Sequence, residues 1–137
     1  MALEYEAITE KIIGAAFVIH RVLGYGLLEK VYQKAMQVEL KHLGLKTELE
    51  TPIKVRFKGY VIGDYFADLL VEEKVVVELK VAENYNSKDE AQLISELKAT
   101  GVRVGLLINF GREKVEFKRL VYSNKSAFDP RSSVAQK

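Results

Sequence analysis

Hydrophobic residues near the start of the chain recur with the spacing of two amphipathic helices. Over residues 4–21, apolar side chains repeat every three or four positions, from Ile8 to Ile19. Gly24-Tyr25-Gly26 interrupts this pattern, and a second run follows over residues 27–43, before Gly44. The spacing predicts five inward positions in this second helix: Leu28, Val31, Tyr32, Ala35 and Val38.

After Gly44 the pattern changes to the period of β-strands. Apolar and basic residues alternate over residues 53–58, which is typical of a strand with one solvated face. Two more apolar runs follow, over residues 66–71 and 75–81, and only Glu72-Glu73-Lys74 separates them. Because such short connections join antiparallel neighbours, we expect the three strands to form an antiparallel meander.

The remaining third of the chain predicts one helix and two strands. Ser87-Lys88-Asp89-Glu90 has the form of a capping box, which begins a helix that we expect to end near Thr100, before Gly101. Residues 102–108 are apolar except Arg103, which favours a central strand buried on both faces, and a last strand is expected around residues 115–120.

The order ααβββαββ predicts a single domain of the α+β or mixed α/β class, which contains a mixed sheet. We expect a single domain over residues 1–122, followed by a polar, flexible tail over residues 123–137, which contains Pro130 and several serines. A length of 137 residues fits one domain.

Composition excludes several kinds of site. The chain has no cysteine, which excludes disulfides, thiolate nucleophiles and cysteine-ligated metals, and its two histidines, His20 and His42, are too few for a histidine-based metal site. Lys and Arg total 21 and Asp and Glu total 19, so the net charge of +2 neither requires nor forbids a nucleic-acid partner. The longest early apolar run is too short to cross a membrane, so we expect a cytoplasmic protein.

Charged residues in two otherwise apolar strands are the candidate chemistry. Glu78 and Lys80 alternate with Val77 and Leu79, so they share one face of the third strand. Asp68 interrupts the second strand in the same way. Since burying charges is costly, a function is one reason for a fold to tolerate them.

The register of the hairpin decides whether these residues meet. With a three-residue loop, Val71 pairs with Val75 and Asp68 lies directly across from Glu78, with Cβ atoms about 5 Å apart. A two-residue loop instead places Leu69 opposite Glu78 and turns Asp68 to the other face.

Two facing carboxylates repel each other unless a cation lies between them. Oxygen ligands without Cys or His favour Mg²⁺ or Mn²⁺, and Lys80 on the same face is suited to stabilise charge on a phosphate. The alternative is a buried Asp–Lys–Glu ion network that only fixes the register of the sheet.

Several sequence blocks resemble known families. Asp68 followed by Glu78-Leu79-Lys80 resembles the D…(D/E)-x-K signature of the PD-(D/E)XK nuclease superfamily, whose core has a similar element order. Gly26-Leu27-Leu28-Glu29-Lys30-Val31-Tyr32 is similar to the motif that names the GxxExxY protein family, and further blocks resemble that family over roughly residues 8–121.

The resemblance implies a restriction-endonuclease-like core and a role for each motif residue. Asp68 and Glu78 would bind the metal, together with the backbone carbonyl of Leu79. Lys80 would be the catalytic lysine, and Glu29 would be a helix-borne acid near the metal or its waters.

Gln92 resembles the glutamine of the Q-x-x-x-Y motif in the RecB-like branch of the superfamily, where it would be a further catalytic residue. The chain departs from that motif, because Glu96 stands at the position of the tyrosine. Gln92 and Glu96 are one helical turn apart and therefore share a face.

Together these observations predict a nuclease that depends on Mg²⁺ or Mn²⁺ and hydrolyses phosphodiester bonds, with DNA favoured over RNA as the partner. A symmetric homodimer is expected, as for small enzymes that cut both strands of a duplex. The alternative is a catalytically inactive module that binds nucleic acid or protein on the same scaffold. A third possibility is a toxin–antitoxin or defence component that needs a partner for activity.

Overall fold

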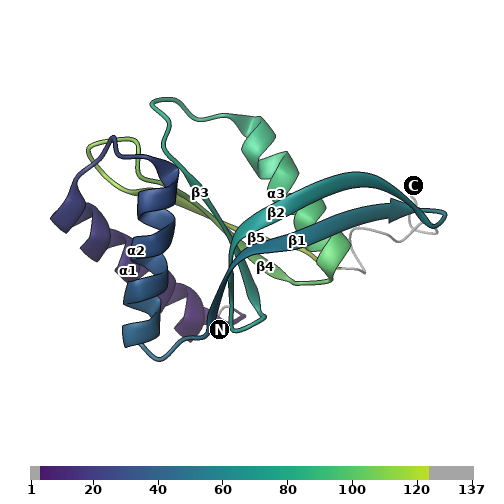
Figure 1. Cartoon of the computed structure of the whole chain (residues 1–137), viewed down its shortest axis with the longest axis horizontal. Coiled ribbons are helices and arrows are strands. Elements are labelled where there is room, and N and C mark those ends of the chain that lie inside the picture. The colour runs from purple at the N-terminus through teal and green to yellow at the C-terminus, as the bar shows by residue number, and fades with distance from the viewer. Residues whose placement is uncertain (1–3, 124–137) are drawn as a thin grey trace.

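The computed structural model describes residues 4–123, so nearly all of the expected C-terminal tail lies outside the described residues. Figure 1 shows three helices and a five-stranded sheet in the order that the sequence predicts. The helices are α1 (Glu6–Leu23), α2 (Glu29–His42) and α3 (Ser87–Thr100). The strands are β1 (Thr47–Phe57), β2 (Tyr60–Val71), β3 (Val75–Lys80), β4 (Val104–Asn109) and β5 (Glu116–Val121). Within residues 4–123, none of the helices is long and apolar enough to cross a membrane.

The strands lie side by side in sequence order, β1-β2-β3-β4-β5. β1, β2 and β3 form the expected antiparallel meander, β4 runs parallel to β3, and β5 runs antiparallel to β4. The parallel pair exists because α3 carries the chain back across the sheet between them. The fold is therefore the predicted mixed α/β architecture.

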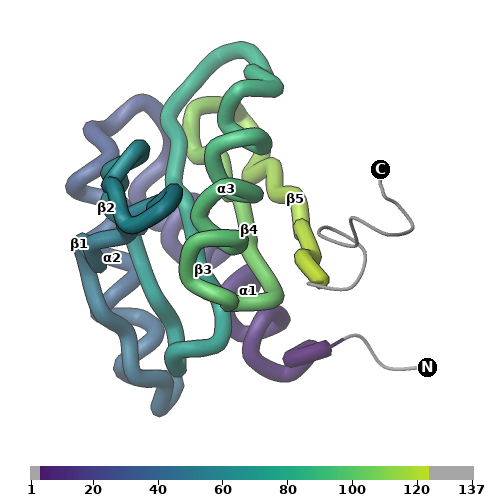
Figure 2. The backbone as a smooth tube through the Cα atoms, turned by 90° about the vertical axis from the view of Figure 1, so that its right-hand side faces the viewer, coloured from purple at the N-terminus to yellow at the C-terminus, as the bar shows by residue number. Residues whose placement is uncertain are grey.

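Helices cover both faces of the central strands, as Figure 2 shows with α1 and α2 on one side and α3 on the other. Val75, Val77 and Leu79 of β3 belong to the core against α1 and α2, whereas Val76 packs in the core beneath α3. The first five residues of β4 are buried, as expected for a central strand. Polar side chains at the centre of this sheet therefore lie beneath a helix.

The predicted inner face of α2 is partly wrong. Leu28, at its N-cap, is 77% exposed, and Val31 and Val38 are exposed as well. The buried residues of α2 are instead Tyr32, Gln33, Met36 and Leu40. Tyr32, Met36 and Leu40 are four residues apart and so lie on one side of the helix. Val31 is rotated by about 100° from Tyr32, which places it outside this buried side. The helix thus turns a polar residue, Gln33, towards the sheet.

Two local details also differ from the prediction. The N-cap of α3 is Asn86, whose side chain accepts a hydrogen bond from Lys88 N, so Ser87 is already helical and the capping box is not formed. Glu90 instead pairs with Lys118 at 2.9 Å. In addition, β1 and β2 are longer than predicted, because their outer ends pair with each other beyond the rest of the sheet.

Candidate active site

The hairpin between β2 and β3 has the three-residue loop that brings Asp68 towards Glu78. Val71 pairs with Val75 and Leu69 pairs with Val77, so the next positions in this register are Asp68 and Glu78. Asp68 Oδ2 accepts a hydrogen bond of 2.7 Å from Leu79 N. The carboxylate therefore reaches across to β3 next to Glu78, and the two-residue alternative does not apply.

A third carboxyl group, on α3, meets this pair. Glu78 faces α3 and is 4% exposed, and Glu96 of α3 is completely buried. The Glu78 carboxyl lies within hydrogen-bonding reach of both Glu96 and Asp68. The residue at the motif-tyrosine position is thus part of the same cluster, which we call the carboxyl cluster: Asp68, Glu78 and Glu96.

Burial and like charge disfavour ionisation of the cluster. Burial, hydrogen bonding to Glu96 and the charges of Glu96 and Asp68 raise the pKa of Glu78 to about 11. Burial also raises the pKa of Asp68, although the hydrogen bond from Leu79 N opposes that shift. Without a cation, Glu78 therefore holds a proton at neutral pH.

Two oxygen atoms in the cluster, Glu78 Oε2 and Glu96 Oε1, are buried and receive no hydrogen bond from an N–H or hydroxyl group of the described residues. Their neighbours are the other carboxyl groups of the cluster, so the proton on Glu78 is what joins it to a partner. Glu96 Oε2 accepts a hydrogen bond of 2.9 Å from Gln92 Nε2, so Gln92 touches the cluster through Glu96. This contact between carboxyl groups depends on a proton, which a bound cation would replace.

Lys80 lies at the open end of β3. Its ammonium is 3.4 Å from Asp89 Oδ1 at the start of α3, and both side chains are only partly exposed. Burial acts to lower the pKa of Lys80, but the charges of Asp89, Glu29 and Glu78 outweigh it and raise that pKa. Lys80 therefore stays protonated, and its ion pair with Asp89 positions its ammonium group beside the carboxyl cluster.

Two residues that the sequence did not single out support Asp68. Gln33 Nε2 of α2 donates hydrogen bonds of 2.9 Å to the Asp68 carbonyl oxygen and to Glu50 Oε2. Glu50 of β1 also accepts a hydrogen bond of 2.6 Å from Lys30 Nζ. The sequence could have indicated Gln33 through its position one helical turn after Glu29, which places both residues on the same side of α2.

Glu29 lies near the site but outside the carboxyl cluster. It is exposed in the first turn of α2, and its charge contributes to the raised pKa of Lys80. Among residues 4–123, no three acidic or histidine side chains are arranged to hold a metal ion between them.

The residues present nevertheless fit a hard divalent cation. Mg²⁺ needs only one or two protein carboxylates and keeps several waters. Asp68 and Glu78 would supply the carboxylates and the Leu79 carbonyl another oxygen. A cation would take the place of the proton on Glu78 and leave its carboxylate oxygens available as ligands.

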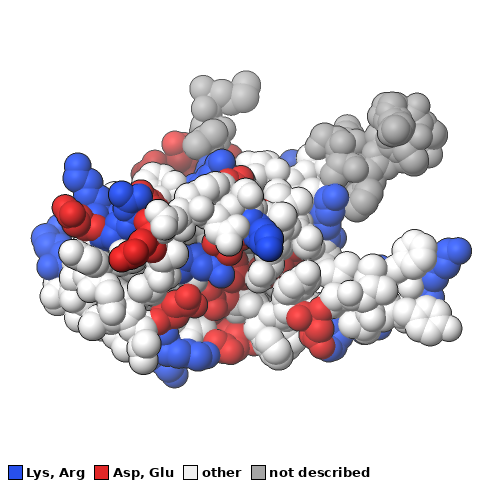
Figure 3. All heavy atoms as spheres, turned by 90° about the horizontal axis from the view of Figure 1, so that it is seen from above, with Lys and Arg blue, Asp and Glu red and all other residues white. Residues whose placement is uncertain are grey.

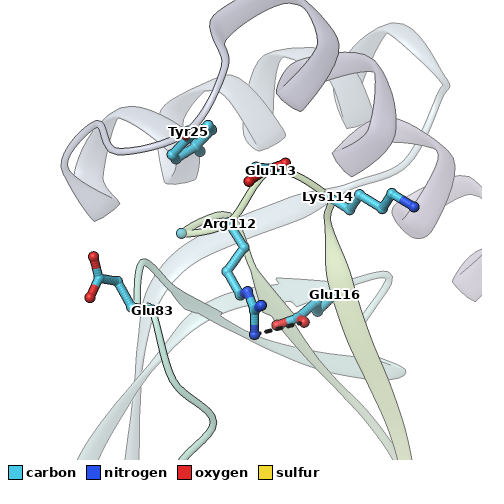
Figure 4. Close-up of a pocket in the computed structure, with 7 residues that line it drawn as sticks. Tyr25, Glu83, Arg112, Glu113, Lys114 and Glu116 are labelled. Atoms are coloured by element: carbon cyan, nitrogen blue, oxygen red, sulfur yellow. Dashed lines mark ion pairs between the residues drawn. The ribbon is translucent and has the colours of Figure 1, made fainter.

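Two pockets open beside this end of the sheet. A cavity of about 240 Å³ has Lys80 and Asp89 in its wall together with Tyr85 and Lys118. The neighbouring pocket in Figure 4, of about 460 Å³, lies between the loops that carry Tyr25, Glu83 and Arg112. Lys80 is thus accessible from an open pocket, whereas Glu96 is completely buried on the side of α3 that faces the sheet.

Comparison with known families agrees with this geometry. The family model of the PD-(D/E)XK nuclease superfamily matches residues 6–120, which include both strands and all three helices around the site. The chain belongs to the PD-(D/E)XK nuclease superfamily. Nucleases of this superfamily generally use divalent metals and act on nucleic acid.

A solved structure entitled "Crystal structure of SSO0001" shares the fold of this PD-(D/E)XK chain, with a TM-score of 0.52 at 18% identity. The match covers 86% of this chain and 60% of the other, so this chain spans less than two thirds of that neighbour. No curated protein matches the chain.

Proposed function

We propose that this protein is a divalent-metal-dependent nuclease that hydrolyses phosphodiester bonds, with Mg²⁺ or Mn²⁺ as its ion. The observation that carries the proposal is the approach of Asp68 to the buried Glu78, with Lys80 beside them. The ordered motifs further support membership of the GxxExxY family and of the RecB-like branch.

Each residue has a distinct task in this proposal. Asp68 is fixed by Leu79 N and by the contact of Gln33 with its carbonyl, so its remaining carboxylate oxygen is held in place for the cation. Lys80 donates hydrogen bonds to the phosphate or to the attacking water, where a positive charge stabilises the transition state. When bound, the divalent ion neutralises charge on the phosphate oxygens.

The test is cleavage of a panel of single- and double-stranded DNA and RNA in Mg²⁺ or Mn²⁺. We expect cleavage that EDTA abolishes, and we expect Asp68→Asn and Lys80→Ala each to remove it while the circular-dichroism spectrum stays unchanged. Lys88→Ala, an exposed lysine of α3, is the matched control and should keep full activity. Undiminished cleavage by either site variant would reject the assigned roles.

A second candidate function is a non-catalytic module that binds nucleic acid or protein. The observation in its favour is Glu96, which replaces the motif tyrosine and meets Glu78 directly. Titration calorimetry with Mn²⁺ separates the two functions, since no binding at millimolar metal favours this candidate.

The proposal extends to partner and assembly. We infer DNA in preference to RNA, a symmetric homodimer, and a cytoplasmic location. Light scattering on the purified chain measures the dimer, and the substrate panel measures the preference between DNA and RNA.

A further inference from the structure

The outer part of the β1–β2 hairpin extends away from the body of the protein. β2 pairs with β3 only over residues 69–71, so over residues 60–67 its only strand partner is β1, with Ile62 unpaired. We call residues 52–66 the arm; Figure 1 shows it leaving the sheet on the side away from α1 and α2. At the base of the arm, Ile53 is buried in the core beneath α3 with Tyr65 packed against it, whereas the ribbon beyond that point has little core to stabilise it.

The end of the arm exposes large apolar side chains. A register shift between Val55 and Arg56 leaves Ile62 without a partner in β1, and such a bulge bends and twists a ribbon. Several large side chains around this bulge are exposed: Phe57, Tyr60, Val61, Ile62 and Phe66. Tyr60 is the most exposed of them, at 76%. Clustered apolar surface of this kind marks an interaction site.

The arm also carries uncompensated positive charge. Its charged residues are Lys54, Arg56, Lys58 and Asp64, which gives three positive charges against one negative and a net charge of +2. Lys54 pairs with Asp64 at 3.0 Å, whereas Arg56 and Lys58 form no ion pair with any residue in the range 4–123. Figure 3 shows Lys and Arg at the end of the projecting arm. The arm's partner is therefore one that supplies negative charge.

We propose that the arm inserts into the major groove of duplex DNA that is bound at the carboxyl cluster. A two-stranded ribbon fits the major groove of B-DNA. Arg56 and Lys58 would contact phosphates, and Phe57, Tyr60 and Ile62 would pack against bases and sugars. A second copy of this chain is disfavoured as the partner, because a symmetric contact between arms would bring Arg56 and Lys58 against their own like charges.

The geometry links the arm to the proposed reaction. Val61 is seven residues from Asp68 along β2, a span of about 23 Å at about 3.3 Å per residue. The contacts of the arm would therefore fall within about seven base pairs of the phosphate at the site, since base pairs are about 3.4 Å apart. The major groove of an RNA duplex is too narrow for a ribbon, so this inference, which rests on the proposed function, selects DNA.

The experiment measures binding of a 20-base-pair DNA duplex, in EDTA, to full-length Asp68→Asn protein, so that cleavage does not enter. In this background, Arg56→Glu/Lys58→Glu should weaken binding at least about tenfold and lower the slope of log K against log salt by about 2, as for two lost phosphate contacts. Lys11→Glu/Lys41→Glu makes the same change in net charge on exposed residues of α1 and α2, and should leave both quantities unchanged. Phe57→Ala/Tyr60→Ala should weaken binding without changing the salt slope.

Several outcomes overturn the inference. Equal losses in the control and arm variants would reject a local contact, and equal affinity for a matched RNA duplex would reject insertion into the major groove. Dissociation of a dimer by the arm variants, with DNA binding unchanged, would assign the arm to a second copy instead. Loss of binding in the arm variants of a protein that never cleaves would reject the proposed function and leave the arm's role intact.

Discussion

Glu78 is a carboxyl group that the fold keeps almost entirely out of water. Its two neighbours in the carboxyl cluster, Asp68 and Glu96, are also acids, so neither hydrogen bonding nor charge favours its ionised form. If this position served only stability, a hydrophobic residue would make the fold at least as stable. The cost is consistent with a site that a cation completes.

The raised pKa of Glu78 has a definite consequence for stability. Because that pKa lies above the ordinary value, the folded state holds a proton that the unfolded state releases. The stability that this proton contributes is complete below about pH 4.5 and is lost as pH rises towards about 11. In metal-free protein, the free energy of unfolding should therefore fall with pH, by up to about 1.4 kcal/mol per unit for one proton.

Glu78→Gln should make this fall shallower, because the amide cannot release a proton, and it should stabilise the protein most at high pH. Urea unfolding in EDTA at pH 5, 7 and 9 measures the effect. Glu83→Gln, on an exposed loop, is the control and should keep the slope of the parent protein. An unchanged slope in Glu78→Gln would mean that Glu78 is already ionised in the folded state.

At the scale of the elements, periodicity and loop length predicted the sheet correctly. The three charged residues between two apolar runs allowed two registers, and the structure has the one with a three-residue loop, which brings Asp68 towards Glu78. The same reasoning failed for α2, because the side of a helix that meets the sheet depends on its neighbours. A stripe containing Gln33 is less hydrophobic than the competing stripe with Val31 and Val38, yet Gln33 is buried because it bonds to β1 and β2.

Gln33→Ala should therefore destabilise the protein by about 2 kcal/mol, since it leaves the Asp68 carbonyl without its partner and opens a gap beneath α2. Gln37→Ala, one turn further along the same helix and only partly buried, should cost under about 0.5 kcal/mol. Urea unfolding measures both. Equal effects would show that the contacts of Gln33 with β1 and β2 contribute nothing to stability.

At the scale of the whole molecule, the sequence motifs identified residues that the fold brings together. They did not show that Glu96 would contact Glu78 or that the arm would extend from the sheet. Asp68, Glu78 and Lys80 were recognisable because charges interrupt apolar strands. The contact of Glu96 with Glu78 depends on how α3 lies over the sheet, which no local pattern encodes. The sequence predicts only an alternating strand in this region. It does not predict the arm, because the arm exists where β2 continues to pair with β1 after its pairing with β3 has ended.

A cation that binds only the folded protein must also stabilise it, by about 2.7 kcal/mol at a concentration one hundred times its dissociation constant. Mn²⁺ should therefore raise the melting temperature at constant ionic strength. The increase should be larger at pH 8 than at pH 6, because the ion displaces the proton held by Glu78. Asp68→Asn should lose this stabilisation, whereas Asp64→Asn, an exposed acid on the same strand, should retain it. Stabilisation that persists in Asp68→Asn would place the ion elsewhere, whatever the cleavage assay shows, because melting reports binding independently of catalysis.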